Sequence, residues 1–304
     1  MDDSNLVLPA KISIVTPSFN QGHFLEETIE SVLSQGYPAL EYFVIDGGST
    51  DDSVSVIKRY QRHLAGWVSE ADRGQSDALI KGFKRATGTV MNWINSDDVL
   101  RPGALAAVGD AWQQSKADLI VGRDIQFTDD VESPVGTFVG AGYEFPDCLR
   151  FWDGRFRYHQ PPTFFSREIY EAVGGLRVDL HYVMDFDLYS RMLAKSSTEV
   201  CYLDAVLTGF RLHVGAKTSR AKAGFLTELR AVSRKAWPAS WDVDAEQTAM
   251  DRYCAECSIF QAAEHVRARS LGEAFAALST AVRFSPLHAL AFATNRALGG
   301  SRAH

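Results

Sequence analysis

The sequence predicts an α/β fold in which a mostly parallel central sheet is flanked by helices and followed by a helical C-terminal extension. Three observations support this prediction. In the first half of the 304-residue chain, short apolar runs alternate with amphipathic stretches, which is the usual pattern of strands and helices in an α/β sheet. A polar loop follows each apolar run, and in an α/β sheet such loops lie together at the carboxyl ends of the strands. From about residue 217 onward, the pattern is almost wholly helical.

Strands and helices alternate regularly at the start of the chain. The predicted strands are 12–16, 42–45, 67–69 and 90–94, and the predicted helices are 23–35, 52–64 and 76–87. In the first helix, Leu25, Ile29 and Val32 recur at helical spacing and share one face. Glu26 and Glu27 stand near its N-terminal end, where the helix dipole favours negative charge.

The alternation continues with less regular spacing further along the chain. Helices are predicted at 104–114, 168–173 and 185–195, and strands at 118–121, 161–166 and 200–212. The glycine-rich and aromatic-rich stretch 128–154 shows no clear period, so its elements are not predicted.

Composition and charge exclude several classes of protein. The formal net charge of −7 and the isoelectric point near 5.6 argue against sequence-independent binding to nucleic acid, which needs a basic surface. The start of the chain lacks the charged and apolar regions of a signal peptide, and no apolar run approaches the roughly 20 residues that cross a bilayer. The four cysteines are too scattered for a disulfide framework. We therefore expect a cytoplasmic protein whose contact with a membrane, at its inner face, would be peripheral.

The common nucleotide-binding fingerprints are missing. The turn after the first strand, TPSFNQG, has one glycine where a dinucleotide site needs GxGxxG, and no GxxxxGK[ST] occurs. Neither a GxSxG elbow nor an HExxH zinc helix is present. Dehydrogenases and P-loop enzymes are therefore disfavoured.

Aspartates follow two of the predicted strands. Asp46 ends the run YFVID and precedes Gly47 and Gly48, which permit a tight turn. A carboxylate held there can accept hydrogen bonds from a ribose or a base, or it can bond the backbone of its own turn. Asp97 and Asp98 end WINSDD, where two adjacent negative charges indicate either a bound cation or a cap on the next helix.

Several segments, taken in order, resemble the successive motifs of family 2 glycosyltransferases of the GT-A fold. They are KISIVTPSFNQGHFLEETIESVLSQGYPALEYFVIDGGSTDDS, SEADRGQSDALIKGFKRATG and WINSDD, and the resemblance resumes at MDFDLYSRM. It implies an enzyme that uses a nucleotide-sugar donor, usually a UDP-sugar. It also implies a catalytic domain over 1–215, with a nucleotide-binding part at 10–122 and an acceptor-side part at 123–215, followed by a helical extension over 216–304.

The resemblance assigns the nucleotide to the loops that follow the first four strands. The residues that it implies are Thr16, Pro17, Ser18, Asn20, Asp46, Gly47, Asp72, Gln75, Lys81, Asn95 and Ser96. All of them lie in the nucleotide-binding part of the expected catalytic domain.

WINSDD resembles the metal motif of the family, which is usually Asp-x-Asp, with Asn95 in the first position. An amide oxygen can contact a hydrated Mg²⁺ or Mn²⁺ but brings no charge, so Asp97 is implied as the principal ligand and Asp98 as the second. His213, in RLHVGAKTS, is implied near the diphosphate and is counted with the metal residues. The metal would neutralise the charge that develops as a nucleoside diphosphate leaves.

A glycosyl transfer also needs a base, because an alcohol attacks poorly until its proton leaves. The stretch YVMDFDLYSRM resembles the family segment that carries the catalytic carboxylate, usually an acid followed by aspartate. Met184 stands in the place of the first acid, so the resemblance implies Asp185 as the base and inversion at the anomeric carbon. From its position alone, Asp185 is equally compatible with an N-terminal helix cap.

Two further regions are implied on the acceptor side and at the C-terminal end. His159 and Gln160, in RYHQPPTFF, resemble the acceptor-side segment of the family, although a lone histidine is more often structural. From His265 onward the arginines are Arg267, Arg269, Arg283, Arg296 and Arg302, and the one acid is Glu273. We expect these basic amphipathic helices to lie on an anionic membrane, to pack on the catalytic domain or to join two copies of the chain.

We therefore expect an inverting, metal-dependent glycosyltransferase that extends a carbohydrate or lipid-linked glycan acceptor in surface polysaccharide or glycolipid biosynthesis, with Mg²⁺ or Mn²⁺ as cofactor. The alternative is a non-catalytic nucleotide-sugar-binding scaffold protein, because acids are usual where Asn95 and Met184 stand. A sugar nucleotidyltransferase is disfavoured, because TPSFNQG carries neither arginine nor lysine.

Overall fold

The computed structural model describes residues 8–290, apart from 156, 214, 217–221 and 268, and divides into two compact units. The N-terminal unit comprises Met1–Phe145 and Arg157–His213, and the C-terminal unit comprises Pro146–Phe156 and Val214–His304. Arg296 and Arg302, counted above among the C-terminal arginines, lie outside the described residues.

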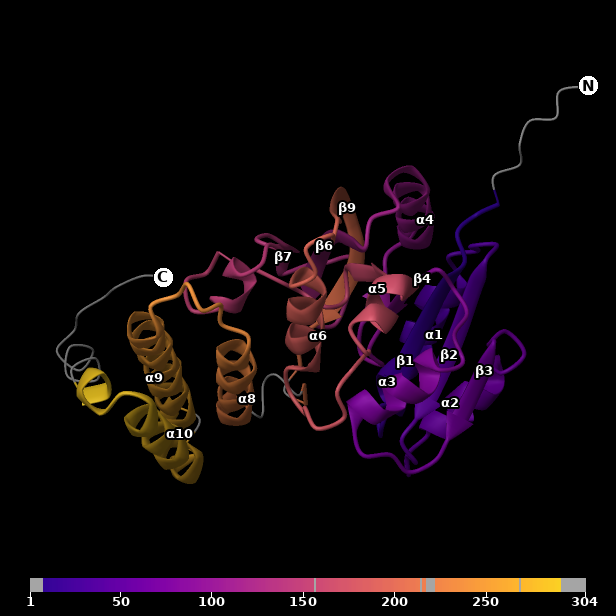
Figure 1. The fold of residues 1–304 in the computed structure, drawn as a ribbon. Helices are drawn as coiled ribbons and strands as arrows, with labels where there is room; N and C mark the ends of the chain where they lie inside the picture. Colours follow the sequence, from indigo (N-terminus) through magenta and orange to yellow (C-terminus); the bar gives the residue numbers. More distant parts are fainter. Residues whose placement is uncertain (1–7, 156, 214, 217–221, 268, 291–304) are drawn as a thin grey trace, which may run out of the picture. The chain divides into compact units, whose positions relative to one another are not determined.

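Parallel strands form one half of a nine-stranded sheet in the N-terminal unit. The strands β1 (Ile12–Ser18), β2 (Leu40–Asp46), β3 (Gly66–Ser69) and β4 (Val90–Trp93) lie in the order β3-β2-β1-β4. They alternate along the chain with α1 (Gly22–Leu33), α2 (Ser53–Tyr60) and α3 (Gln75–Phe83), as Figure 1 shows. Ser18 stands opposite Asp46, and Asp46 stands opposite Ser69, so β1, β2 and β3 end at the same edge. The predicted α/β alternation is confirmed.

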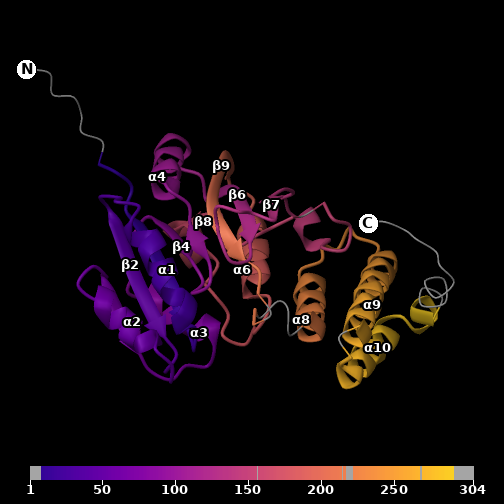
Figure 2. The same ribbon diagram turned by 180° about the vertical axis from the view of Figure 1, so that it is seen from behind.

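The other half of the sheet mixes strand directions. The strand β8 (Thr163–Ser166) pairs antiparallel with β4, and β6 (Leu119–Phe127) pairs antiparallel with β8. β9 (Val200–Arg211) runs parallel to β6, while β5 (Val99–Leu100) and β7 (Gly136–Val139) pair antiparallel with β9 and β6. The helices α4 (Ala104–Ser115), α5 (Arg167–Ala172) and α6 (Met184–Leu193) also belong to this unit, and α4 and α6 are labelled in Figure 2. β5 and β7 are too short to give a clear strand pattern in the sequence.

Apolar residues pack on both faces of the sheet. Successive residues of a strand point to opposite faces, and Ile14 of β1 joins Leu25 and Ile29 of α1 in one buried cluster. A second cluster is aromatic, and in it the ring centres of Phe83 on α3 and Trp93 on β4 lie 6.2 Å apart. Because apolar side chains and helices cover the two faces of the sheet, the polar loops lie at the carboxyl edge of the parallel strands.

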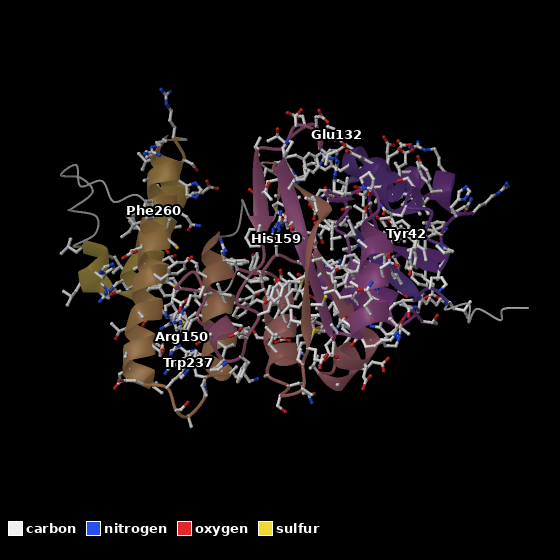
Figure 3. The ribbon with its side chains drawn as sticks, turned by 90° about the horizontal axis from the view of Figure 1, so that it is seen from above. Tyr42, Glu132, Arg150, His159, Trp237 and Phe260 are labelled. Carbon is white, nitrogen blue, oxygen red and sulfur yellow. The ribbon has the colours of Figure 1, made fainter. Side chains whose placement is uncertain are left out.

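The described part of the C-terminal unit includes three long helices and a segment from between β7 and β8. The helices are α8 (Lys222–Lys235), α9 (Val243–Arg267) and α10 (Leu271–Phe284), and the segment Pro146–Phe156 contains the short helix η1 (Asp147–Leu149). Arg150, labelled in Figure 3, fixes the segment: its Nε donates to Glu246 Oε1 over 2.9 Å, and its guanidinium lies 4.0 Å from the ring centre of Trp241. From the sequence, this segment was expected in the acceptor-side part of the first domain.

The C-terminal helices expose apolar side chains. On α10, Leu271, Phe275, Leu278 and Val282 are all exposed, and Phe275 is exposed to 75%. Phe260 on α9, labelled in Figure 3, is also exposed. Within the described ranges, however, no helix combines the length and the apolar character needed to cross a bilayer.

Candidate active site

The loops after β1 and β2 are joined by hydrogen bonds. Asn20 has a left-handed backbone with a φ of 53°, which asparagine tolerates better than most residues. Its N–H donates to Ser49 Oγ over 2.8 Å, and its Oδ1 accepts from Thr50 N over 2.8 Å. Asp51 accepts from Gly22 N, at the start of α1, over 2.9 Å. Asn20 therefore shapes the edge of the sheet through its own amide, and its contact with a nucleotide stays a prediction.

Asp46 lies at the end of β2 with no exposed surface. Its Oδ2 accepts from Gly48 N over 3.1 Å, from Ser49 N over 2.9 Å and from Ser69 Oγ over 2.6 Å. Its Oδ1 accepts from Ser49 Oγ over 2.5 Å. The carboxylate thus bonds its own turn, which is the structural alternative that the sequence allows for this residue. Contact between Asp46 and a nucleotide stays a prediction.

Asp72 lies against Gly47, another of the predicted nucleotide residues. A Cβ on residue 47 would stand 2.6 Å from Asp72 Oδ2, so glycine is needed for this close approach. Asp72 Oδ1 accepts from Gly74 N over 2.8 Å. Unlike Asp46, Asp72 keeps part of its surface exposed. The loops after β2 and β3 therefore present a half-buried carboxylate at the shared edge.

The end of β1 has one paired hydroxyl and one without a partner. Thr16 Oγ1 lies 2.9 Å from Tyr42 OH, and both residues are at most 1% exposed, so the Thr16 side chain supports the sheet instead of facing a ligand. Pro17 is buried next to it. Ser18 Oγ is buried at the strand end and has no hydrogen-bond partner in the described structure. Phe19, which the sequence did not single out, is 61% exposed beside it.

Lys81 is paired with acids instead of standing ready for a phosphate. Its Nζ lies 2.9 Å from Glu70 Oε1 and 3.6 Å from Asp77 Oδ2. The hydrogen bond to Glu70 is the largest of the causes that raise the pKa of Lys81 above its ordinary value. Lys81 stands in the second turn of α3, from which its side chain reaches back to these acids, and the predicted contact with a phosphate would require these ion pairs to break.

Asn95 is the centre of a hydrogen-bond network. Gln75 Nε2 donates to Asn95 Oδ1 over 2.7 Å, and Asn95 Nδ2 donates to Asp98 Oδ2 over 3.0 Å. The same Nδ2 lies 3.4 Å from Gln160 Oε1. Ser96, the next residue, is 4% exposed. Asn95 therefore ties the loop after β4 to the start of α3 and to the segment before β8.

The adjacent carboxylates of Asp97 and Asp98 have different surroundings. Asp97 Oδ2 lies 2.9 Å from His213 Nε2, and both side chains are partly exposed. Asp98 is 1% exposed, and its Oδ1 accepts from Arg211 N over 3.1 Å. Burial raises the pKa of Asp98 well above its ordinary value, and the carboxylates of Asp97 and Asp124 raise it further. Both oxygens of Asp98 are bonded within the protein, so the predicted role of Asp98 as second metal ligand would require these bonds to break.

Asp97 and His213 form a pair of possible ligands. Among the residues that the structure describes, no three His, Cys, Asp or Glu side chains gather in a way that could hold a metal ion. A metal at this place would therefore need ligands from its substrate or from water in addition to these two side chains.

Arg211 holds this loop in place and was not predicted. It is the last residue of β9 and is 4% exposed. Its Nε donates to Asp97 O over 3.1 Å, its Nη2 forms an ion pair with Glu27, and its guanidinium lies 4.4 Å from the ring centre of Phe127. Its place at the end of a predicted strand, two residues before His213, is the signal that could have found it.

Asp185 is the second residue of α6, which begins at Met184. Val183 occupies the N-cap position, so Asp185 is not the helix cap that the sequence allowed as an alternative. Ser76 Oγ lies 3.0 Å from Met184 Sδ, which brings the start of α6 next to the start of α3. Asp185 is partly exposed, and its charge adds to burial in raising the pKa of Tyr158 well above its ordinary value.

His159 and Gln160 differ in exposure. Gln160 is 5% exposed, and its Nε2 donates to Trp93 O over 2.7 Å and to Asn92 Oδ1 over 3.1 Å. It therefore supports the end of β4, and the predicted contact with an acceptor would require these bonds to break. The side chain of His159, labelled in Figure 3, remains 20% exposed, with Nδ1 lying 2.8 Å from Asp124 Oδ2.

Partly exposed polar groups from separate strand ends thus belong to one unit. Asp97 and His213 offer an oxygen and a nitrogen to a cation, and Asp72 offers an acceptor to a polar ligand. Asp185, near the N-terminal end of a helix, is stabilised as an anion and can accept a proton from a hydroxyl group.

Comparison with known protein families and relatives gives a consistent result. The profile described as "Glycosyl transferase family 2" matches residues 13–174. An uncharacterized glycosyltransferase of Nostoc sp. is 33% identical over 124 residues, which are 38% of this chain and 38% of the relative. An uncharacterized glycosyltransferase of Mycobacterium tuberculosis is 29% identical over 207 residues, 63% of this chain and 73% of the relative. The match to the first of these therefore spans less than half of the relative's length.

Solved structures share the fold at low sequence identity. TarS 1-349 of S. aureus in complex with UDP-GlcNAc superimposes with a TM-score of 0.63 at 14% identity, covering 90% of this chain and 81% of that chain. The mannosyltransferase PcManGT of Pyrobaculum calidifontis, in complex with GDP-Man and Mn²⁺, gives a TM-score of 0.61 at 20% identity, covering 96% and 81%. At these identities the likeness concerns the fold.

Proposed function

The chain belongs to glycosyl transferase family 2, whose profile matches residues 13–174 of its 304, and we propose that it transfers one sugar from a nucleotide-sugar donor to a carbohydrate acceptor with inversion at the anomeric carbon. The N-terminal unit is the proposed catalytic domain. The observation that carries the proposal is the presence of Ser18, Asp72 and Asp97 at and after the carboxyl ends of β1, β3 and β4. Open α/β sheets bind their ligands at this edge.

The nucleotide of the donor would lie on the loops after β1, β2 and β3. Ser18 Oγ is a buried hydroxyl without a partner among the described residues, and a base or ribose would satisfy it. The exposed ring of Phe19 offers a face on which a base can stack. Asp72, beside Gly47, can accept a hydrogen bond from a ribose hydroxyl. Solved structures with the same fold are complexes with UDP-GlcNAc, UDP and GDP-Man, which supports a nucleotide-sugar donor, and we propose a UDP-sugar.

Asp97 and His213 would hold a divalent cation between the loop after β4 and the end of β9. The fit rests on Asp97 Oδ2 and His213 Nε2, which approach to 2.9 Å while both side chains keep exposed surface. One carboxylate and one imidazole suit Mn²⁺ better than Mg²⁺, which prefers oxygen ligands. When bound, the cation would neutralise the charge on the leaving nucleoside diphosphate.

Asp185 would take the proton of the acceptor hydroxyl. The acceptor oxygen bonds to the anomeric carbon, the bond from that carbon to the diphosphate oxygen breaks, and the proton passes to the carboxylate. A single displacement of this kind inverts the anomeric carbon. The contact between Ser76 and Met184 supports the role, because it brings Asp185 close to the loop that carries Asp72.

The acceptor and the cellular setting are proposed from a relative and from the C-terminal unit. A putative teichuronic acid biosynthesis glycosyltransferase of Bacillus subtilis is 32% identical over 92 residues, which supports an acceptor in surface polysaccharide or glycolipid assembly. The exposed stripe of Leu271, Phe275, Leu278 and Val282 on α10 carries the exposed Arg283 next to it. This combination supports peripheral contact with an anionic membrane at its cytoplasmic face. The alternative is that the exposed apolar stripe of α10 joins two copies of the chain.

Binding and turnover of UDP-sugars test the proposal. Calorimetry with UDP, with and without Mn²⁺, is expected to give Mn²⁺-dependent binding that Asp97→Ala loses. Asp185→Ala should keep UDP binding while transfer is lost, and Asp110→Ala, at an exposed aspartate on α4, is the matched control. Full turnover by Asp185→Ala would remove its role as base. UDP binding by the wild type without turnover of any UDP-, GDP-, CMP- or dTDP-sugar would favour the non-catalytic scaffold.

A further inference from the structure

A buried aspartate outside the predicted site holds His159. Asp124 lies in β6 with no exposed surface, and its Oδ2 is 2.8 Å from His159 Nδ1. An ionised carboxylate can only accept a hydrogen bond, so Nδ1 carries the hydrogen, and a neutral ring then leaves its lone pair on Nε2. Among the described residues, no protein group bonds to Nε2, although the side chain is 20% exposed.

Two phenylalanines restrict the plane of the His159 ring. The ring centre of Phe138 on β7 lies 4.9 Å away, and that of Phe210 on β9 lies 4.6 Å away. The main-chain oxygen of His159 accepts from Thr163 Oγ1 over 2.6 Å. These contacts hold the backbone and the ring of His159, and Nε2 is the ring nitrogen left for a ligand.

The pair stands next to the loop after β4. Gln160 follows His159 in the chain, and its Oε1 lies 3.4 Å from Asn95 Nδ2. The charge of Asp124 also acts on the buried carboxyl of Asp98 in the same loop. The imidazole is thus beside the part of the site that the proposed function gives to the cation and the diphosphate.

Stability alone does not explain a carboxylate at this place. Asp124 Oδ1 is buried without a partner among the described residues, and so is the hydroxyl of Thr208, which stands opposite on β9. Burying a charge with unmet hydrogen-bonding capacity is destabilising, whereas an apolar pair would fill the same space without that penalty. A carboxylate behind an imidazole does, however, fix the tautomer and the orientation of the ring.

We propose that Asp124 is a positioning residue that holds His159 so that Nε2 accepts a hydrogen bond from a hydroxyl group of the acceptor sugar. This inference rests on the proposed function, in which Asp185 remains the base. The contact forms no covalent bond and moves no proton, so its effect falls on acceptor binding.

Asp124→Asn tests the inference, because an amide can donate to Nδ1 as well as accept from it and no longer fixes the tautomer. The probes are UDP-GlcNAc with Mn²⁺ as donor, and the octyl glycosides of glucose, galactose, mannose and N-acetylglucosamine as acceptors. We expect KM for the octyl glycoside to rise about 10- to 100-fold. The affinity for UDP and the hydrolysis of UDP-GlcNAc by water should stay unchanged, because neither involves the acceptor. His288→Leu removes a pair of 2.6 Å with Glu256 in the C-terminal unit, and as the matched control it should alter none of these values.

An unchanged KM, or an equal loss of transfer and hydrolysis, would overturn the inference. Nitrogen-15 NMR of His159 adds a readout that needs no acceptor: the wild-type ring should carry its hydrogen on Nδ1, and Asp124→Asn should populate the Nε2–H form. A wild-type ring with hydrogen on Nε2 alone would also overturn it. If Asp124→Asn does not fold, His159→Gln takes over the kinetic test. Failure of the wild type to bind UDP would instead overturn the proposed function, and the NMR result would still decide the role of Asp124.

Discussion

Gly47→Ala should weaken nucleotide binding by displacing Asp72. The added Cβ would stand 2.6 Å from Asp72 Oδ2 and 3.1 Å from its Cγ, which is closer than side chains normally approach. Gly48, the next residue, has a φ of 83° and needs glycine for its conformation, but Gly47 is outside that left-handed region. The effect of alanine at position 47 therefore passes through the Asp72 side chain, which must swing away.

The magnitude follows from the contact that this movement breaks. Asp72, which accepts from Gly74 N over 2.8 Å, would move away from its proposed contact with a ribose hydroxyl, and a hydrogen bond to a charged group contributes about 1.5–3 kcal/mol. Because Asp72 is half-exposed, water replaces part of that interaction. We expect a loss of about 1–2 kcal/mol in the free energy of UDP binding, which is about 5- to 30-fold in Kd. The free energy of unfolding should change by less than about 1 kcal/mol, because the displaced side chain lies at the surface.

Calorimetry with UDP and Mn²⁺ on Gly47→Ala, Asp72→Ala and the double variant checks this reasoning. If Gly47 acts through Asp72, the double variant should bind UDP no more weakly than Asp72→Ala. Gly272→Ala is the matched control, because a Cβ at that position meets open space. Additive losses would refute the route through Asp72, and an unchanged Kd in both single variants would refute the contact between Asp72 and the nucleotide.

Three further predictions concern residues whose structural roles were not expected. Arg211→Met should lower the free energy of unfolding, measured in urea, by about 2–3 kcal/mol. The loss is smaller than for a fully buried ion pair because Glu27 is half-exposed. A loss below about 0.5 kcal/mol would contradict the role of Arg211 in holding the loop after β4. The pKa of Asp98 is raised in the folded protein, so the protonated carboxyl of Asp98 stabilises the fold at low pH. This stabilisation is complete below the pKa of an unfolded carboxyl, near 4, and is lost as the pH rises through the raised pKa of the folded state. Asp98→Asn should flatten that fall in urea unfolding measured from about pH 4 to 8, and an equally steep fall in the variant would count against it. Lys81→Met should leave the affinity for UDP unchanged. It should lower the free energy of unfolding by about 0.5 kcal/mol, since its partner Glu70 is 54% exposed. A tenfold weaker binding of UDP would instead support the predicted contact between Lys81 and a phosphate.

The parallel half of the sheet could be predicted because its strands are apolar runs with both faces covered. Ile12–Ser18 is buried throughout, and Leu40–Asp46 is buried over most of its length. Such runs stand out between amphipathic helices. The order of the loops then follows from parallel strands, which all end at one edge. For this reason the sequence predicts Asp46, Asp72 and Asp97 at a common edge.

Contacts between distant segments could not be predicted in the same way. Pro146–Phe156 leaves the first unit and is fixed in the second by Arg150, which pairs with a residue about a hundred positions away. Arg211 and Asp124 act through partners on other strands, and no local pattern marks such a partner. Asp97 and Asp98 look alike in the sequence, yet one reaches His213 and the other is buried beneath the loop.

The aspartates of the site fall into two groups by their solvent exposure, and the sequence alone does not distinguish these groups because all six residues are aspartate. The buried group is Asp46, Asp98 and Asp124, and the partly exposed group is Asp72, Asp97 and Asp185. A buried carboxylate cannot exchange its protein donors for a ligand without leaving those donors unsatisfied, so we expect its main role to be holding a loop or a ring. Alanine at any of the six positions is expected to lower transfer, and activity alone therefore does not distinguish the groups. The free energy of unfolding does, because it should fall for the buried group and change little for the exposed group. A loss of stability in Asp97→Ala equal to that in Asp98→Ala would mean that the Asp97 carboxylate is also part of the framework, and the proposed metal site would lose its main ligand.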